Sequence, residues 1–460
     1  MIVTDEKIIN EFLDRGVSAV YPSKEYLKKE LLSGKQLSIY LGVDPTGPNL
    51  HIGHMICLNK LSQFQKLGHK VIFLIGSFTA MIGDPTGKSS SRKQLTREDV
   101  LENCKRYKEQ ASVYLNFEGE NPVELKYNSD WHDKLTFKEV VELSSHFTVN
   151  QMIEREMFQE RLKFDFECPF CGIRQLYSRA HQTKYGIESD LRGKELVDDR
   201  VCENCGKKIR NEEIKNIHKP QPIGLHEFLY PLMQGYDSVA MNVDGEIGGN
   251  DQIFNMLAGR DLIKDLKNKE KFVVAMKLLT DSTGKKMGKS EGNMISLGDS
   301  SKDMFGKIMS WTDGMIMSGF DLCTNISNEK IKEYEQQLKN GVNPRDLKIV
   351  LAEEILKIYF GEKIAKQEVD NFISQFSEKR LPESIDSIRI AGQQSVLDLL
   401  VYSGMCSSKT EARKMIEQGA VKVYDKDENM RKVSDINEII DIDKENIVQV
   451  GKLKYIKIVK

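Results

Sequence analysis

The sequence predicts an α/β protein whose first domain is built on an open parallel sheet. Residues 37–43 and 71–75 are apolar runs of strand length, and the second run is typical of a strand buried on both faces. Between them, residues 52–67 carry apolar side chains at helical spacing and end at Gly68. A strand, a helix and a strand in this order form a right-handed parallel unit, so we expect ligands at the carboxyl ends of the strands.

Composition narrows the class of protein. A chain of 460 residues is too long for one core, so about two to four domains are expected. The net charge of −2 offers no argument for nucleic acid, and no apolar run reaches the ~18 residues that span a bilayer. The first residues lack the features of a secretory signal, and four of the eight cysteines form two Cys-x-x-Cys pairs. These features favour a cytoplasmic protein that binds metal and has no membrane segment.

The segment between the first strand and its helix is the strongest candidate for a binding site. The strand breaks at Gly42, the chain turns through residues 44–46, and His51-Ile-Gly53-His54 begins the helix. A helix N-terminus offers unpaired N–H groups and the positive end of a dipole, which favour phosphate. The two histidines add donors, and Gly53 lets a nucleotide lie close to the backbone. The segment therefore predicts a site for the phosphates of ATP.

Beyond about residue 325 the pattern becomes helical. Asn343 and Pro344 are typical of a helix cap and a first helical position, and they precede an apolar face made by Leu347, Leu351, Ile355 and Ile358. We predict a helical domain over residues 326–388, followed by a third domain over residues 392–460.

A second motif completes the nucleotide site. Lys286 and Lys289 lie three positions apart in the Gly-rich loop 281–293. Such a loop by itself is usually a solvated surface turn, but two lysines at this spacing could bind a polyphosphate. With residues 51–54, the loop resembles the class I aminoacyl-tRNA synthetases, whose signatures are His-Ile-Gly-His and Lys-Met-Ser-Lys-Ser. Here Gly288 replaces the middle serine, and both lysines are kept. A P-loop at residues 83–89 is excluded because three residues, rather than four, separate its glycines.

A polar stripe over residues 228–237 narrows the resemblance. Tyr230, Gln234 and Asp237 lie on one face of a predicted helix, where they must be exposed, paired in the core or in contact with a ligand. The stripe resembles the tyrosine-binding helix of tyrosyl-tRNA synthetases. The resemblance implies that Tyr230 and Gln234 hold the ammonium of L-tyrosine, while Asp237 and Tyr40 bond its phenol. Without that phenol both would be left unpaired, and such sites reject the analogue lacking a hydroxyl by ~10⁴–10⁵.

The same resemblance implies the remaining contacts of a Rossmann-like catalytic domain over residues 1–325. It gives Asp84 to the ammonium and Gln252 to the substrate or adenylate. The ATP contacts that it implies are Gly42, Asp44, His51, Gly53, His54, Gly249, Asp251, Lys286 and Lys289. Leu41 stands where many relatives carry a cysteine near the ribose, so a slightly weaker ATP affinity is expected.

The implied activity is that of a tyrosine–tRNA ligase, which forms tyrosyl-adenylate and transfers the tyrosyl group to the 3′ end of tRNA(Tyr). The tyrosine carboxylate is ionised near pH 7, so its attack on the α-phosphate needs no general base. The resemblance implies that charge is stabilised by Thr46, His51, His54, Lys88, Arg92, Lys286 and Lys289, with Mg²⁺ assisting. Two rival functions are a paralogue that activates a tyrosine-like acid for another pathway and an RNA-binding regulator with an inactive core.

Residues 392–460 resemble the small S-four-like RNA-binding module shared with a ribosomal protein. The matching stretches are 396–400, 407–416 and 419–423, and Ser408 with Glu411 predicts a capping box. On this helix the residues expected to contact tRNA are Lys409, Arg413 and Lys414. A solvated charged helix is the alternative, because basic and acidic residues are nearly balanced here.

Two Cys-x-x-Cys-Gly knuckles lie in a segment, residues 164–216, that is extra relative to this family. Four thiolates from such knuckles suit a tetrahedral structural Zn²⁺, with the ligands Cys168, Cys171, Cys202 and Cys205. Iron in a rubredoxin-like site and uncoordinated thiols are the alternatives. The family implies a homodimer, and because the insertion falls in the connective region that carries the dimer interface, a role in dimerisation or acceptor-stem contact stays open.

Overall fold

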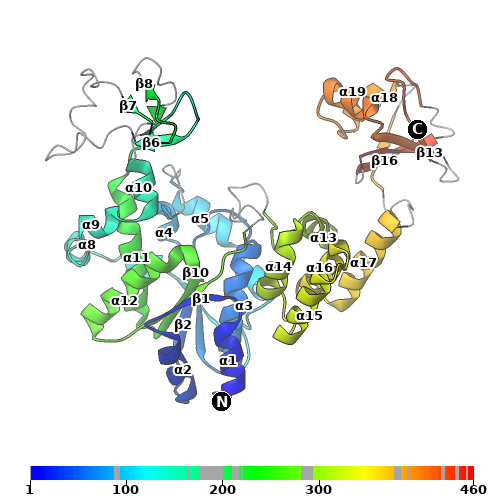
Figure 1. Ribbon diagram of the computed structural model, residues 1–460. Coiled ribbons are helices and arrows are strands. Elements are labelled where there is room, and N and C mark those ends of the chain that lie inside the picture. The colour runs from blue at the N-terminus through cyan, green and yellow to red at the C-terminus, as the bar shows by residue number, and fades with distance from the viewer. Residues whose placement is uncertain are drawn as a thin grey trace. The chain divides into compact units, whose positions relative to one another are not determined.

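The computed structural model describes residues 2–86, 94–162, 165–176, 200–202, 204–209, 217–218, 221–280, 294–377, 385–390, 394–425, 430–440, 445–451 and 454–459. The chain forms two compact units, Met1–Ala365 and Lys366–Lys460 (Figure 1). None of the helices in these described ranges is long and apolar enough to cross a bilayer. The predicted domain boundaries at 325 and 392 remain predictions.

A mixed sheet forms the centre of the first unit (Figure 1). Its order is β1-β11-β10-β2-β3-β4, and β1 alone among these described strands runs antiparallel to its neighbour. The strands are β1 (Val17–Tyr21), β2 (Ser38–Val43), β3 (Lys70–Ile75), β4 (Glu124–Tyr127), β10 (Gly245–Gly249) and β11 (Phe272–Met276). The strands predicted at 37–43 and 71–75 are confirmed as β2 and β3. Their apolar side chains are buried in the core, which is why the apolar runs predicted them.

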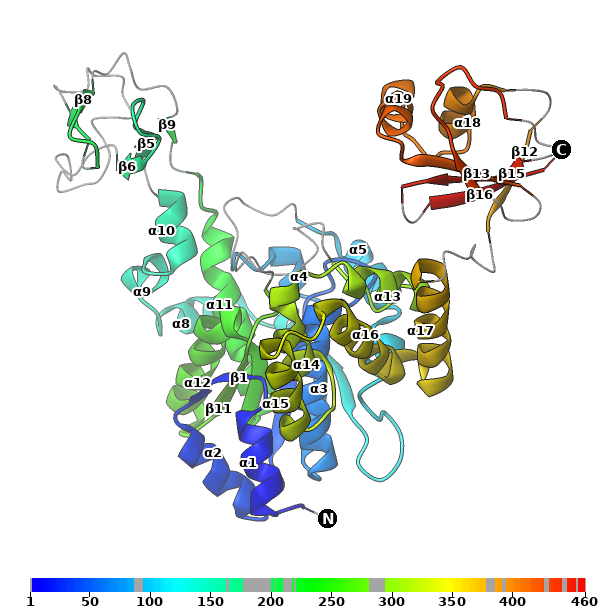
Figure 2. The same cartoon turned by 45° about the vertical axis from the view of Figure 1, so that its right-hand side comes forward.

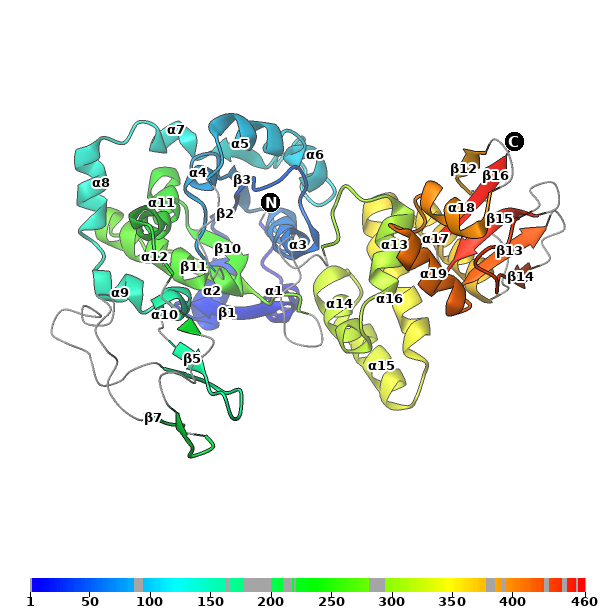
Figure 3. The ribbon, with the colours of Figure 1, turned by 90° about the horizontal axis from the view of Figure 1, so that it is seen from above.

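The direction of winding reverses between β2 and β10. Helix α3 (Ile52–Lys66) joins β2 to β3 in one direction, and α12 (Ile253–Lys267) joins β10 to β11 in the other. Right-handed crossovers in opposite directions place the two helices on opposite faces of the sheet, as the view from above shows (Figure 3). The carboxyl ends of β2 and β10 are therefore the position where open α/β sheets bind ligands.

Helix α11 (Leu225–Met241) packs closely along α12. A Cβ on Gly235 would lie 3.2 Å from the backbone nitrogen of Gly259, and a Cβ on Gly259 would lie 2.6 Å from Lys271 Nζ. Glycine at both positions thus permits the close approach and leaves room for a buried lysine beside the helices. The close packing fixes the face of α11 that carries the predicted polar stripe.

Other helices of the first unit surround this centre. Those that precede α11 are α1 (Glu6–Asp14), α2 (Lys24–Leu32), α4 (Thr79–Ile82), α5 (Arg97–Cys104), α6 (Tyr107–Ala111), α7 (Ser129–His132), α8 (Phe137–Ser144), α9 (Val149–Ile153) and α10 (Glu156–Leu162). Those that follow β11 are α13 (Ser301–Met309), α14 (Ile316–Cys323), α15 (Asn328–Lys339) and α16 (Pro344–Phe360). The predicted start of α16 is confirmed, since the Asn343 side chain accepts a hydrogen bond from the Arg345 N–H at 3.0 Å.

Short strands lie between α10 and α11 in the chain (Figure 2). One sheet has the order β6-β5-β9, and β7 pairs with β8. Their bounds are β5 (Asp165–Glu167), β6 (Arg174–Leu176), β7 (Arg200–Val201), β8 (Lys208–Ile209) and β9 (Ile217–His218). These strands bring the two cysteine knuckles into one small module.

Helix α17 (Glu362–Ser377) leads into the second unit, which is an α+β fold. Helices α18 (Val396–Tyr402) and α19 (Lys409–Glu417) share an apolar core with the sheet β12-β16-β15-β13-β14. The strands are β12 (Ser387–Arg389), β13 (Val421–Asp425), β14 (Met430–Lys432), β15 (Glu445–Val450) and β16 (Lys454–Val459). The predicted capping box is wrong in one half. Ser408 accepts from the Glu411 N–H, but the Glu411 carboxylate accepts from Ser407, one residue before the cap.

Candidate functional site

Two histidines build the start of α3. His51 is the N-cap, its Nδ1 accepts the Gly53 N–H at 3.1 Å, and the His51 N–H donates to His54 Nδ1 at 3.1 Å. The two rings stack with centroids 3.8 Å apart. Because each Nδ1 accepts, each neutral imidazole carries its proton on Nε2 and presents a donor there. A Cβ on Gly53 would lie 3.0 Å from the His51 ring, so this glycine makes room for the stack.

The carboxyl end of β2 is tied to α11 and α4 through Asp44. Its Oδ2 accepts from the Tyr230 hydroxyl at 2.8 Å, and its Oδ1 accepts from Thr79 Oγ1 at 2.7 Å. Burial, followed by the charge of Asp44, raises the pKa of Tyr230 well above its ordinary value. Tyr230 is therefore a neutral donor at physiological pH. Thr46 is exposed, two residues beyond Asp44.

The end of β10 contributes a second group of predicted residues. Gln252 Nε2 donates to Asp84 Oδ2 at 2.8 Å, which joins two residues that lie 168 positions apart. A Cβ on Gly249 would lie 2.4 Å from Asp251 Oδ1, so a larger residue there would displace the Asp251 carboxylate. A Cβ on Gly42, by comparison, would have only ordinary van der Waals contacts, the nearest at 3.7 Å.

Asp237 is buried and accepts hydrogen bonds from three side chains in and next to α7. Its Oδ1 accepts from Trp131 Nε1 at 2.8 Å and His132 Nε2 at 2.7 Å, and its Oδ2 accepts from Asn128 Nδ2 at 3.3 Å. The expectation that Asp237 lacks a partner without a phenol is therefore wrong. A carboxylate has about four acceptor positions, so Oδ2 retains capacity for one more donor. Burial raises the pKa of Asp237, although these three donors oppose the shift.

A buried ion pair lies behind Tyr40, and the sequence interpretation missed it. Lys271 and Glu246 are 0% and 2% exposed, and Lys271 Nζ contacts both Glu246 Oε2 and Ser238 Oγ, the latter at 2.7 Å. Ser238 Oγ lies 3.1 Å from the Tyr40 hydroxyl, so Tyr40 is not unpaired either. Glu246 Oε1 accepts from Gln234 Nε2 at 3.0 Å. The available signal was a charged residue within one strand, Glu246 in β10, and another directly before the apolar run of the next, Lys271 before β11.

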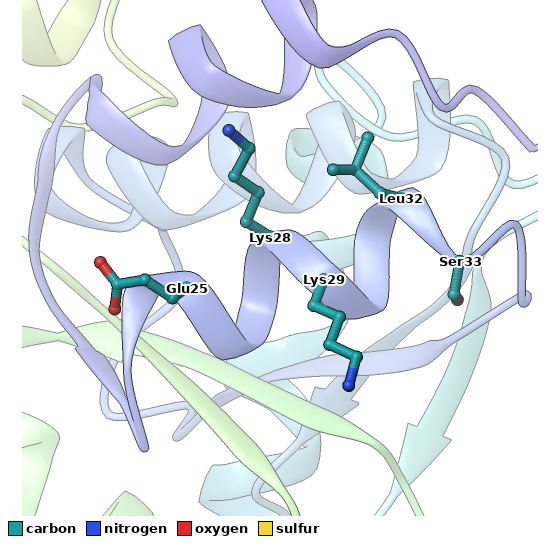
Figure 4. A pocket seen from close by; sticks show the side chains of 5 residues that line it. All are labelled: Glu25, Lys28, Lys29, Leu32 and Ser33. Atoms are coloured by element: carbon teal, nitrogen blue, oxygen red, sulfur yellow. The ribbon is translucent and has the colours of Figure 1, made fainter.

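The structure thus brings together Tyr40, Asp44, Asp84, Tyr230, Gln234, Asp237 and Gln252 around the ends of β2 and β10. Lys88, Arg92, Lys286 and Lys289 lie outside the described residues. A separate surface hollow is lined by Glu25, Lys28, Lys29, Leu32 and Ser33 (Figure 4). It lies on α2, which precedes the amino end of β2, and so belongs to the opposite edge of the sheet from this site.

Comparison with known proteins identifies the family. A family model described as tRNA synthetases class I (W and Y) matches residues 32–173 and 205–377, and a Tyrosine–tRNA ligase SYY-like C-terminal domain model matches 378–458. The Tyrosine–tRNA ligase of Carboxydothermus hydrogenoformans is 39% identical, covering 98% of this chain and 97% of its own. The chain belongs to the tyrosyl-tRNA synthetase family. Its activity is that of a tyrosine–tRNA ligase.

Other relatives agree with this placement. The Tyrosine–tRNA ligase of Thermotoga maritima is 37% identical to the synthetase, covering 97% of this chain and 96% of its own. The tyrosyl-tRNA synthetase from Archaeoglobus fulgidus, solved with L-tyrosine, has a TM-score of 0.54 and 19% identity over 79% of this chain and 100% of its own. At this identity the solved structure supports the α/β fold.

The family model leaves residues 174–204 unmatched, a stretch shorter than the extra segment predicted at 164–216, and this stretch includes Cys202 of the second knuckle. Four Sγ atoms lie within 4.8 Å of one another, with Cys168–Cys205 at 3.8 Å and Cys171–Cys202 at 3.6 Å. These separations are too long for disulfides. Gly172 and Gly206, at φ +72° and +66°, close the two knuckles in the same way. The cluster has the donor number and softness of a tetrahedral metal site.

Proposed function

We propose that the synthetase binds L-tyrosine at the ends of β2 and β10, with its ammonium held by Asp84, Tyr230 and Gln234. The observation that supports this most is the convergence of Asp84–Gln252 and Asp44–Tyr230 at the point where the winding of the sheet reverses. The half-buried carboxylates of Asp44 and Asp84 suit a cation with several N–H donors, such as the ammonium group of an amino acid.

The phenol end of the substrate is assigned to Tyr40 and Asp237. Tyr40 Oη lies 3.1 Å from Ser238 Oγ, and a hydroxyl has capacity for more than one bond. Asp237 keeps one acceptor position beyond its three donors. A phenol that bonds both groups would gain two interactions that phenylalanine lacks, which is the physical basis of selection for tyrosine.

The nucleotide half is assigned to the start of α3 and to residues beyond the described ranges. Thr46, His51 and His54 contact the ATP phosphates and ribose, with the Nε2–H groups of the histidines as donors. Gly42, Gly53, Gly249 and Asp251 shape the nucleotide pocket, and Lys88, Arg92, Lys286 and Lys289 stabilise the departing pyrophosphate. Mg²⁺, when bound with ATP, supplies charge neutralisation on the phosphates.

Tyrosine-dependent exchange of pyrophosphate into ATP, followed by charging of tRNA(Tyr), tests this assignment. Lys286→Ala should slow exchange by about 10²-fold or more while tyrosine affinity changes less than about twofold, because the lysine acts on transition-state charge. Lys29→Ala, on α2, is the matched control and should leave both unchanged. Equal losses of exchange rate and tyrosine affinity in Lys286→Ala would contradict the role of this lysine.

The cysteine cluster is proposed to hold structural Zn²⁺ through Cys168, Cys171, Cys202 and Cys205. Four thiolates leave no open coordination position, so the ion would cross-link the knuckles rather than take part in catalysis. Elemental analysis should give one Zn per chain, falling to near zero in Cys171→Ser but not in Cys104→Ser, whose thiol lies outside the cluster. Iron in place of zinc would support the rubredoxin-like alternative, and no metal would support uncoordinated thiols.

The second unit is proposed to bind tRNA through the exposed residues Lys409, Arg413 and Lys414 of α19. Lys409 also pairs with Asp398 at 2.6 Å. Arg413→Ala should therefore weaken tRNA charging more than Lys409→Ala, and it should leave pyrophosphate exchange unchanged. We also propose a cytoplasmic homodimer, which sedimentation of the purified synthetase would test.

A further inference from the structure

Asp84 and four other residues form a closed ring of hydrogen bonds. Asp84 Oδ2 accepts from Gln252 Nε2 at 2.8 Å, and Gln252 Oε1 accepts from Asn255 Nδ2 at 3.0 Å. Asn255 Oδ1 and Thr86 Oγ1 both accept from Arg155 Nη2, at 3.1 and 3.0 Å. The Thr86 N–H donates to Asp84 Oδ1 at 2.9 Å and completes the ring.

Arg155 sets the orientation of the two side-chain amides in this ring, those of Asn255 and Gln252. A guanidinium only donates, so the Asn255 atom beside it must be the carbonyl oxygen, and the Asn255 amide nitrogen then faces Gln252. Gln252 must accept from Asn255 and donate to Asp84. Reversing either amide would place two donors or two acceptors face to face. Arg155 is therefore a positioning residue for Gln252 and Asp84.

Arg155 also has a terminal nitrogen, Nη1, with no hydrogen-bond partner among the described residues. The residue is 9% exposed, and Nη1 itself is buried. Leaving a buried donor unpaired costs about 1–3 kcal/mol, and more for a charged group, which points to a missing anionic or polar ligand. The Phe254 ring lies 4.5 Å from the guanidinium and covers one of its faces.

The guanidinium lies beside the proposed ammonium contacts. Burial lowers the pKa of Arg155 to about 10, while the nearby Asp84 and Tyr230 raise it, so the group stays charged at neutral pH. In an α-amino acid the ammonium and the carboxylate are attached to one carbon atom. A cation next to Asp84 and Tyr230 is therefore in place for the carboxylate when the ammonium binds these two residues.

We propose that Arg155 Nη1 binds the α-carboxylate of the amino-acid substrate. The proposal rests on the ammonium site assigned above to Asp84 and Tyr230. One carboxylate oxygen accepts from Nη1, and the other remains available to attack the α-phosphate. Arg155 thus has two roles, since Nη2 orients the ring that holds Gln252 and Nη1 orients the reacting end of the substrate.

Tyramine, which has the ammonium and phenol of tyrosine but no carboxylate, provides the test. Equilibrium dissociation constants for tyrosine and tyramine are measured on the full chain and on Arg155→Gln. Arg155→Gln should weaken tyrosine binding by about 10- to 100-fold more than tyramine binding, because both ligands lose the ordered ring but only tyrosine loses a charged hydrogen bond. Asp84→Asn is the matched control, and it should weaken both ligands because both carry the ammonium.

Each other outcome has a definite meaning. Equal weakening of tyrosine and tyramine in Arg155→Gln would reduce Arg155 to a structural role and overturn the carboxylate contact. Unchanged tyrosine binding with a raised KM for ATP would assign Nη1 to a phosphate and overturn it as well. Arg155→Lys, which keeps the cation in a buried site, should show a smaller difference between the two losses, with tyrosine again weakened more than tyramine. Failure of the folded wild-type chain to bind either ligand would instead contradict the proposed function.

Discussion

Replacing Lys271 with methionine should destabilise the first unit and disturb the proposed tyrosine site together. The substitution keeps most of the side-chain volume but removes the cation that contacts the buried carboxylate of Glu246. It also removes the 2.7 Å donor to Ser238, which is the partner of the Tyr40 hydroxyl. Gln234 Nε2 then remains as a described donor to Glu246.

The magnitude follows from the burial of both groups. Breaking a fully buried ion pair by removing one partner costs about 3–5 kcal/mol, because the remaining charge is left desolvated. Gln234 still donates one hydrogen bond to that charge, so we expect the lower end, about 3 kcal/mol. Glu246→Gln combined with Lys271→Met removes both charges and keeps the hydrogen bond to Gln234. The free energy of unfolding of the double variant should therefore lie within about 1 kcal/mol of the wild-type value.

Urea unfolding followed by tryptophan fluorescence measures this effect selectively. Both tryptophans of the chain, Trp131 and Trp311, lie in the first unit, so the signal reports that unit. Lys277→Met is the matched control. Lys277 pairs with Asp321 at 3.0 Å but is half exposed, and its loss should cost less than about 1 kcal/mol. The reasoning would be refuted if Lys271→Met lowered the free energy of unfolding no more than Lys277→Met does. It would also be refuted if the double variant were as unstable as Lys271→Met alone.

Three further predictions concern stability. Burial lowers the pKa of His69 to about 4, so between about pH 6.5 and pH 4 the unfolded chain binds a proton that the folded chain does not. The free energy of unfolding should therefore fall on acidification through this range. His69→Gln should reduce that fall in urea titrations at pH 7 and pH 5. Burial lowers the pKa of Lys60 to about 7, so between about pH 7 and pH 10.5 only the unfolded chain keeps this proton and the free energy of unfolding should rise with pH. Lys60→Met should remove that rise. Parallel pH profiles of the wild type and the variant would contradict this prediction. Gly259→Ala should lower stability by about 1–3 kcal/mol in calorimetry, because its Cβ would lie 2.6 Å from Lys271 Nζ. Gly306→Ala, where a Cβ meets nothing within 4 Å, should not be destabilising, and equal losses at both glycines would contradict the steric argument.

Local features of this protein were predictable from the sequence. The strands β2 and β3, the helix that begins at His51, the Asn343 cap and the paired cysteine knuckles each depend on neighbours within a few positions of the chain. Spacing, capping residues and glycine positions encode such features directly. Each cysteine knuckle is such a local turn, whereas the contact between Cys168 and Cys205 joins residues 37 positions apart and was predicted from the chemistry of a shared metal.

Tertiary structure alone decided which groups satisfy the buried polar residues. Asp237 was expected to lack a partner, yet its donors come from residues 128–132, more than a hundred positions earlier. Lys271 with Glu246, and Arg155 with Asn255, are likewise pairs that no periodic pattern joins. Their partners are set by which strands lie side by side and by the close approach of α11 and α12. A buried polar group must find a partner wherever the fold supplies one, and that choice is made in three dimensions.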